Sequence, residues 1–316
     1  SDGWQWSRDG KKIAFWKFDQ TRVKEFYLID EMSAYNRVMP LKYPKVGEQN
    51  AIVKIGVIDL HTFKTNWMDT GPDDDIYLPR MYWTNSSSDL SIIRLNRLQN
   101  QLDFILADTE SGESKIILSE SDSCWVDVEE KHAIFPGNEN IFLWVSEKSG
   151  YRHIYLYDYS GNLLQQVTSG EWEVTSIEGY SESDKLVCFY GKKNLETEQH
   201  IYRVKTDGTG FEKMTNESGW NEANFSPGYK YFIHNYKSLN TPLNVYLRRT
   251  NGELVKTLRE NNFPAFSEYD LPFPELGSFK TSDGVRLNYM IIKQKDFDPN
   301  NKYSGKVTIF SLPSAR

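Results

Sequence analysis

One phrase of this chain reveals its organisation: Ser149-Gly150-Tyr151-Arg152-His153-Ile154-Tyr155-Leu156-Tyr157-Asp158-Tyr159-Ser160-Gly161-Asn162-Leu163. Around Ile154 and Leu156, apolar side chains alternate with others, which is the period-two pattern of a half-buried β-strand. The run at 158–161 predicts a tight turn, because glycine adopts positive φ at no steric cost and Asp or Ser can bond the local backbone. The chain then runs back over 163–168. The phrase therefore predicts a strand, a turn and a return strand.

The same strand–turn–strand phrase recurs four more times, at 57–64, 105–113, 202–210 and 245–254. We mark the five copies at Phe63, Gly112, Gly161, Gly208 and Gly252, and these marks are 49, 49, 47 and 44 residues apart. A period of roughly 40 to 50 residues with hairpin signals is typical of β-propeller blades, each a four-stranded sheet. One blade cannot bury both of its faces alone, so blades must stack around an axis. The sequence therefore predicts an all-β propeller.

A second repeated phrase predicts where blades begin. It consists of an aromatic residue, serine, a turn, lysine and an apolar strand, and it occurs at 4–16, again at 223–233 and more weakly at 179–189. Polar stretches at 43–50 and 71–75 predict loops, each leading into a strand. Since the first copy lies at the start of the chain, we expect residue 1 to lie inside a repeat.

The composition changes near Pro264, where proline and phenylalanine become dense. We predict propeller blades over 1–262, a connector over 263–276 and the start of a second domain over 277–316. The last segment opens with a hairpin pattern around Ser282-Asp283-Gly284. It is too short to bury a core by itself.

Composition and charge exclude several classes of function. Aromatic residues make up 14% of the 316 residues, which suits strands and packing between blades. The formal net charge is −7 and no Lys/Arg cluster is present, which argues against nucleic-acid binding. No apolar run of about 18 residues predicts a membrane span, and no signal peptide is visible. Cys124 and Cys188 are expected to be unpaired thiols, although a bridge between neighbouring blades stays open.

We expect no metal site and no cofactor. No pair of histidines or cysteines has the spacing of metal ligands. The three aspartates at 73–75 indicate a solvated turn, since no ordered series of ligands follows them. Glycosylation triplets at 85–87 and 216–218 are short enough to arise by chance.

Four segments stand in consistent order along the chain: 4–18, Tyr43-Pro44-Lys45-Val46-Gly47, 149–155 and Gly170-Glu171-Trp172-Glu173-Val174. Together they resemble the propeller of the dipeptidyl peptidase IV family. The segments 279–284 and 295–303 resemble the first strands of that family's α/β-hydrolase domain. The resemblance implies an eight-bladed propeller, incomplete here, in a serine exopeptidase that removes Xaa-Pro or Xaa-Ala dipeptides, or tripeptides in some relatives. It also implies peptide or protein N-termini as substrates, and a homodimer.

The groups that would perform this chemistry are not in the chain. The nucleophile motif Gly-x-Ser-x-Gly occurs nowhere, and the aspartate and histidine of the triad would follow it. A triad built from the five histidines is not expected, because triads are defined by geometry. The family's paired-glutamate amine clamp would lie upstream of Trp4. We therefore assign no catalytic residue. Because 304–316 fits the family poorly, we leave open whether it is contiguous with the rest.

Two places are candidate substrate contacts. The stretch 125–130 aligns with a family loop that approaches the substrate pocket, and it carries acids where relatives carry basic and aromatic groups. If Glu129 and Glu130 face the pocket, their field favours a cationic N-terminus. The alternative is a solvated blade loop. Arg152 offers a planar fork of five donors, suited either to a structural clamp or to a substrate contact.

Two other functions stay open. A propeller can be a binding module without catalysis, because a fold does not fix function. The chain can also come from a related acylaminoacyl peptidase or prolyl oligopeptidase, and the sequence upstream of Trp4 would separate these. We expect a periplasmic or cell-envelope location.

Overall fold

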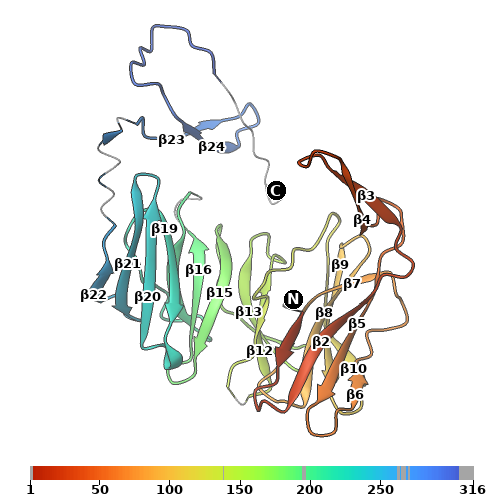
Figure 1. The fold of residues 1–316 in the computed structure, drawn as a ribbon. Helices are drawn as coiled ribbons and strands as arrows, with labels where there is room; N and C mark the ends of the chain where they lie inside the picture. Colours follow the sequence, from red (N-terminus) through yellow and green to blue (C-terminus); the bar gives the residue numbers. More distant parts are fainter. Residues whose placement is uncertain are drawn as a thin grey trace.

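A computed structural model describes residues 3–137, 139–193, 197–261, 264, 268–269 and 271–305. Nearly all the regular structure within these residues is β-strand. Five successive segments each form a four-stranded antiparallel sheet, and Figure 1 shows these sheets side by side. The predicted all-β fold with propeller-like sheets is therefore confirmed.

We call the sheets blades 1 to 5 in chain order. Blade 1 contains β1 (Trp4–Trp6), β2 (Lys12–Asp19), β5 (Ile52–Asp59) and β6 (Thr65–Trp67). Blade 2 contains β7 (Ile76–Trp83), β8 (Asp89–Asn96), β9 (Gln101–Asp108) and β10 (Ser114–Ser121). Blade 3 contains β11 (Ala133–Ile134), β12 (Ile141–Ser146), β13 (His153–Asp158) and β14 (Leu163–Gln166).

Blade 4 contains β15 (Glu173–Ser181), β16 (Leu186–Lys192), β17 (His200–Lys205) and β18 (Glu212–Lys213). Blade 5 contains β19 (Trp220–Phe225), β20 (Tyr231–Ser238), β21 (Thr241–Arg249) and β22 (Leu254–Arg259), with a 3-10 turn at Pro227–Tyr229 between its first two strands. In every blade each strand pairs with the next strand of that blade along the chain.

The repeated phrase occupies the same place in every blade, the hairpin between the third and fourth strands. All five marked residues have positive φ, from 55° at Phe63 to 88° at Gly252. Four of them are glycine, which adopts this conformation without the steric cost that a Cβ brings. The glycine of the repeated segment is therefore explained by the positive φ that this turn requires in each blade.

Neighbouring blades share apolar cores. Successive side chains of a strand point to opposite faces of its sheet, so each face meets a different neighbour. In β9, Phe104 packs in the core shared with blade 3, whereas Ile105 packs in the core shared with blade 1. In β12, Trp144 faces blade 2 and Leu143 faces blade 4. Blades 2 to 4 therefore bury both of their faces.

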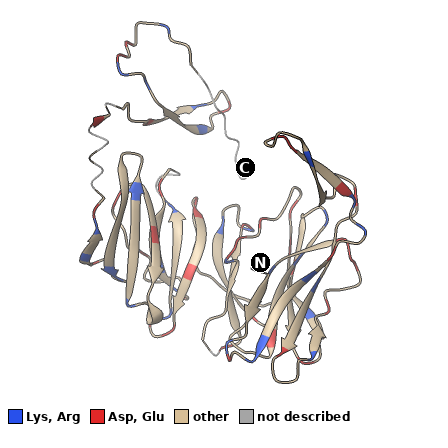
Figure 2. Ribbon diagram, viewed as in Figure 1, with Lys and Arg blue, Asp and Glu red and all other residues tan. Residues whose placement is uncertain are grey.

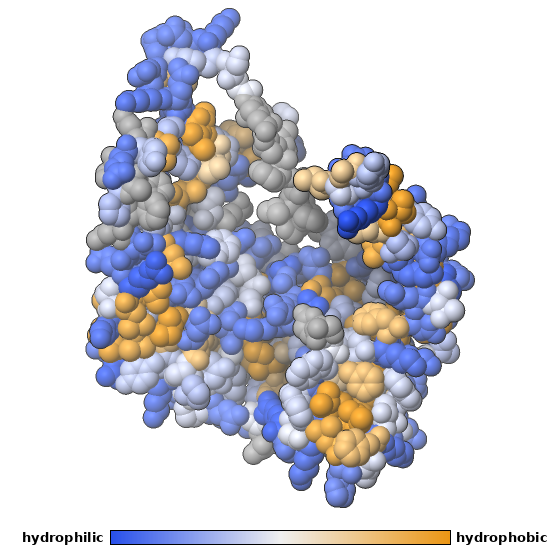
Figure 3. All heavy atoms as spheres, in the orientation of Figure 1, coloured by the Kyte–Doolittle hydropathy of each residue, from blue (hydrophilic) through white to orange (hydrophobic). Residues whose placement is uncertain are grey.

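The two end blades keep apolar side chains exposed. On blade 1, Trp4 and Trp67 are 49% and 43% exposed. On blade 5, Leu254 and Leu258 of β22 are almost equally exposed. Figure 3 shows apolar surface over both end blades. Blades 2 and 3 also expose apolar side chains on their fourth strands, where Ile116, Leu163 and Leu164 are 49% to 52% exposed. The buried apolar side chains gather where neighbouring blades meet.

Two hairpins extend beyond the five sheets (Figure 1). One consists of β3 (Glu25–Asp30) and β4 (Arg37–Lys42), inserted between β2 and β5. The other consists of β23 (Glu275–Lys280) and β24 (Arg286–Ile291), and the predicted turn at 282–284 joins its strands.

Several features predicted from the sequence lie outside the sheets. The loops at 43–50 and 71–75 are present, and β5 and β7 follow them closely. Cys124 and Cys188 are both free thiols, as predicted. In the predicted connector at 263–276, residues 263, 265–267 and 270 lie outside the described residues, and β23 begins within it at Glu275. Residues 306–316 also lie outside the described residues, so the contiguity of 304–316 stays an open question.

Replacing Gly161 tests the contact between blades 2 and 3. A Cβ at Gly161 would lie 2.0 Å from the carbonyl oxygen of Ile117, whereas one at Gly150 would meet no atom within 4 Å. Both glycines have positive φ, so both alanine variants carry the backbone cost of roughly 1 to 2 kcal/mol. We expect Gly161→Ala to lower the free energy of unfolding by about 1 to 3 kcal/mol more than Gly150→Ala, measured by urea denaturation. Equal losses in the two variants would contradict the close approach of the blades.

Candidate functional site

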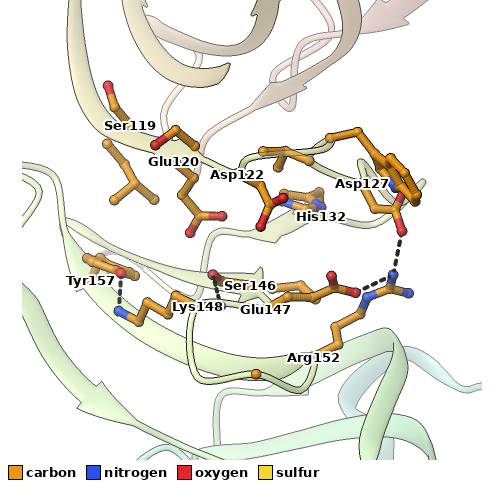
Figure 4. A pocket seen from close by; sticks show the side chains of 16 residues that line it. Ser119, Glu120, Asp122, Asp127, His132, Ser146, Glu147, Lys148, Arg152 and Tyr157 are labelled. Carbon is orange, nitrogen blue, oxygen red and sulfur yellow. Dashed lines mark hydrogen bonds and ion pairs between the residues drawn. The ribbon is translucent and has the colours of Figure 1, made fainter. Parts of the chain in front are cut away.

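The three candidate residues lie on two loops at one side of blades 2 and 3. Glu129 and Glu130 belong to the connection from β10 to β11, and Arg152 ends the turn between β12 and β13. The structure brings Glu129 and Arg152 into direct contact, and Figure 4 shows Arg152 next to Asp127 and Glu147. Asp127 and Glu129 lie on one segment, and Glu147 and Arg152 lie on another, about 20 positions further along the chain.

Arg152 binds three carboxylates. Its Nη2 atom lies 2.9 Å from Glu147 and 3.2 Å from Asp127, and its Nη1 atom binds Glu129. The Arg152 side chain is only 14% exposed, while the carboxylates are more open to solvent. The guanidinium thus joins the β10–β11 connection to the β12–β13 turn. This geometry suits a structural clamp, one of the two roles considered for Arg152.

The backbone of the acidic pair is also fixed. Arg80 donates to the carbonyl oxygen of Glu129 at 3.3 Å, and the hydroxyl of Tyr82 donates to that of Glu130 at 2.8 Å. Glu129 is half-buried against Arg152, whereas Glu130 is exposed. The two adjacent acids therefore have different environments, and Glu130 presents the carboxylate that faces solvent.

His132 is a buried member of this site that the sequence did not single out. Its Nδ1 atom accepts the Glu129 N–H at 3.2 Å, and its ring lies edge-on to Trp144 with centroids 4.3 Å apart. Burial, with Arg152 and Arg80 nearby, lowers the pKa of His132 to about 3, so the imidazole is neutral at physiological pH. No spacing rule points to this residue, because its burial arises from packing between blades.

A cavity of about 340 Å³ lies between blades 2 and 3, bordered by Arg152 and His132 (Figure 4). Glu120 accepts a hydrogen bond from Nε1 of Trp144 at 2.9 Å, and burial raises the pKa of the Glu120 carboxyl. Lys148 donates to the Tyr157 hydroxyl at 2.6 Å, and burial lowers the pKa of its ammonium. Of these residues, Glu120, Lys148 and Tyr157 line the cavity, and no sequence motif pointed to them.

The rest of the described surface adds no further chemical signature. Figure 2 shows lysines and arginines interspersed with acidic residues over the blades. Among the described residues, no cluster of three or more His, Cys, Asp or Glu side chains is placed to hold a metal ion. Within the same residues, no helix has the length and apolar character needed to cross a membrane.

The repeated four-stranded sheets and their shared cores define a propeller-type protein. Residues 1–243 match the family model described as the dipeptidyl peptidase IV N-terminal region. The chain therefore belongs to the dipeptidyl peptidase IV family, as its sequence motifs indicated. The match lies in the N-terminal region of that family, the part in which the motifs at 4–18 and 149–155 were found.

Individual relatives agree with this assignment. Dipeptidyl peptidase 4 of Trichophyton tonsurans is 27% identical over 327 residues, which span 98% of this chain and 42% of the relative. That of Trichophyton rubrum is 28% identical over 328 residues, with the same coverage. The chain thus spans about 42% of the length of these curated relatives.

Two solved structures resemble this fold. Porphyromonas gingivalis dipeptidyl peptidase 4 has a TM-score of 0.86 and 31% identity, over 95% of this chain and 43% of that one. A protein described as a dipeptidyl aminopeptidase IV from Bacteroides ovatus has a TM-score of 0.85 over 95% of this chain and 46% of that one. At 24% identity, the second likeness shows the fold alone.

Removing the guanidinium tests the clamp. In Arg152→Gln, three carboxylates lose their shared partner, and we expect the free energy of unfolding to fall by about 1 to 3 kcal/mol. We also expect faster amide exchange over 122–131. The control is Arg203→Gln, which breaks the single, more exposed pair with Glu212 and should cost at most about 1 kcal/mol. If both variants lose the same stability and exchange over 122–131 is unchanged, Arg152 is not a clamp.

Proposed function

We propose that the protein carrying this chain is a dipeptidyl peptidase IV-like serine exopeptidase that releases Xaa-Pro or Xaa-Ala dipeptides from peptide N-termini. The observation that carries the proposal is the match of residues 1–243 to the N-terminal region of that family. The names of the relatives support it, since the Trichophyton and Porphyromonas proteins are dipeptidyl peptidases. We assign the activity to the whole protein, because the chain spans less than half of these relatives.

In this proposal the blades gate access to the catalytic chamber. Blades 2 to 4 are packed on both faces, so they form a stiff wall that a folded protein cannot deform. A flexible chain terminus can pass where a folded domain cannot. The nucleophile, general base and oxyanion hole would belong to a hydrolase domain, of which 277–316 would be the start.

The acidic loop has a proposed role in attracting substrate. Glu129 is half-buried and bound to Arg152, so the exposed Glu130 is the better candidate to attract the ammonium group of a peptide. Arg152 then acts as a positioning residue, because it holds the loop that carries Glu130. A solvated loop with no substrate contact remains the alternative for these acids.

Two rival functions are alternatives to this proposal. A non-catalytic binding module would lack Gly-x-Ser-x-Gly downstream, and an acylaminoacyl peptidase or prolyl oligopeptidase would lack the acidic pair upstream of Trp4. The names of the relatives favour the dipeptidyl peptidase. We further propose a periplasmic or cell-envelope location.

We also propose that the protein forms a homodimer. The β3–β4 hairpin supports this, because it extends from blade 1 and exposes Tyr27, Ile29, Met32 and Tyr35. Exposed apolar side chains of this kind mark interaction surfaces. Light scattering on the full-length protein would give twice the monomer mass if the proposal holds.

Turnover of chromogenic dipeptide substrates tests the proposed activity. The full-length protein should cleave Gly-Pro and Ala-Pro p-nitroanilides, and acetylation of the substrate N-terminus should abolish cleavage. Glu130→Gln should raise KM by about two- to threefold with little change in kcat, as expected for one solvent-screened charge. Glu113→Gln, which removes an exposed carboxylate on the β9–β10 turn, is the matched control. Absence of turnover, or cleavage of the acetylated substrate, would contradict the proposal.

A further inference from the structure

A buried chain of polar side chains crosses the boundary between blades 4 and 5. Blade 4 contributes His200, the first residue of β17, and blade 5 contributes Asn221 of β19, His234 of β20 and Arg248 of β21. His200, Asn221 and His234 are at most 2% exposed. Buried polar groups are stable only with partners, so their hydrogen bonds decide how the two blades fit together.

Arg248 fixes the protonation state of His234. Its Nε–H donates to Nδ1 of His234 at 3.1 Å, and its Nη2 atom binds Glu217 in the connection between the blades. An arginine nitrogen can only donate, so Nδ1 of His234 is an acceptor and the ring proton is on Nε2. This Nε2–H donates to the side-chain oxygen of Asn221 at 2.8 Å. His234 is therefore neutral.

Asn221 continues the chain into blade 4. Because its oxygen accepts from His234, its amide nitrogen is the atom that lies 3.3 Å from Nδ1 of His200. The amide nitrogen donates to this Nδ1, and the His200 proton is then on Nε2. This Nε2–H donates to the Glu198 carboxylate at 3.0 Å. The four hydrogen bonds therefore run in one direction, and both imidazoles accept at Nδ1 and donate at Nε2.

A second proton on either ring would interrupt this chain. On His234 it would face the N–H of Arg248 and place a second positive charge beside the guanidinium. On His200 it would face the amide N–H of Asn221, although the Thr215 hydroxyl, 3.3 Å from the same Nδ1, could still accept it. The closed boundary therefore requires neutral rings, most strictly at His234.

Charged and titratable groups surround the two rings from both blades. Around His200 they are Glu198, Tyr202, Lys213 and Glu217, and around His234 they are Glu217, Tyr236, Tyr246, Arg248 and His200 itself. Burial is the main cause that lowers the pKa of both histidines, and the cations Lys213 and Arg248 add to it. The two glutamates oppose this shift only in part, and the pKa of His234 falls to about 4.

We propose that this network is a pH-sensitive switch, which holds the boundary between blades 4 and 5 closed at neutral pH and lets it open reversibly in mild acid. When the boundary opens, both rings reach water and take up protons, so acid favours the open state. An exposed histidine has a pKa of about 6.5. The stabilisation from neutral His234 is therefore complete above about pH 6.5 and is lost as the pH falls toward about 4.

The boundary between blades 1 and 2 is an internal comparison. Its core contains Ile55, Leu90 and Ile105, which are all buried. Of the five histidines of the chain, only His61 belongs to these two blades, and it is exposed on the turn between β5 and β6. Mild acid should therefore leave this boundary closed.

Hydrogen exchange of the full-length protein at about pH 7.5 and about pH 5 tests the switch, with labelling times corrected for the intrinsic effect of pH on exchange. We expect protection over β19, β20 and 213–221 to fall about tenfold or more in acid, because the open state gains the proton affinity that burial withholds from His234. Protection over β5 and β8 should change by less than about twofold. Return to neutral pH should restore the lost protection.

A variant without the two titrating rings separates the switch from general acid destabilisation. In His200→Gln/His234→Gln, each side-chain amide can still donate and accept, but it takes up no proton in this range. We expect the acid response between blades 4 and 5 to shrink to less than about twofold. His61→Gln removes an exposed histidine outside the network and is the matched control, so it should keep the full response.

Three results would overturn the inference. They are unchanged protection over β19 and β20 in acid, an equal loss of protection over β5 and β8, and a full acid response in the double variant. The first two are measured on the unaltered protein, so the test stands even if the double variant fails to fold. None of these readouts depends on substrate turnover, so failure of this inference can be told apart from failure of the peptidase proposal.

Discussion

Packing between blades is the constraint on which this structure depends. A four-stranded sheet has two apolar faces, and only a neighbouring blade on each side can remove both from water. Phe104 and Ile105 are consecutive residues of β9, yet they belong to different cores. The backbones of blades 2 and 3 approach each other closely at Gly161. A Cβ there would collide with the carbonyl oxygen of Ile117 in blade 2. The alternation of apolar side chains and the glycine at the turn therefore both allow neighbouring blades to pack closely.

The same packing places the candidate site. The core between blades 2 and 3 includes Phe104 and Trp144, and the Trp144 indole reaches outward to Glu120 in the cavity. The loops that meet at Arg152 are the β10–β11 connection, which joins these two blades, and the β12–β13 turn of blade 3. A charged cluster can therefore assemble from separate stretches of sequence because the sheets beneath it are fixed. Within this cluster, Glu129 is bound to Arg152, whereas the carboxylate of Glu130 is exposed to solvent.

The fold could be predicted well from the sequence, because the packing of blades requires short sequence patterns that repeat in every blade. Glycine at the marked turns and period-two alternation both follow from backbone geometry, so the hairpins could be placed from the order of residues alone. Phe63 was placed by spacing, and its φ of 55° shows that the turn has the same form without glycine. The candidate site was less predictable. Arg152 was singled out, but its partners Asp127 and Glu147 depend on how two loops meet, and the burial of His132 depends on the blade interface.

Hydrogen exchange in a Phe104→Ala variant tests the central claim most directly. Phe104 is fully buried in blade 2, and its ring lies 4.6 Å from that of Trp144 and 5.0 Å from that of Phe142, both in blade 3. If blades are stable only through their neighbours, amides of β12 and β13 in blade 3 will exchange faster in the variant, as will those of blade 2. Faster exchange confined to blade 2, with blade 3 unchanged, would show that each sheet is stable by itself and would contradict the account.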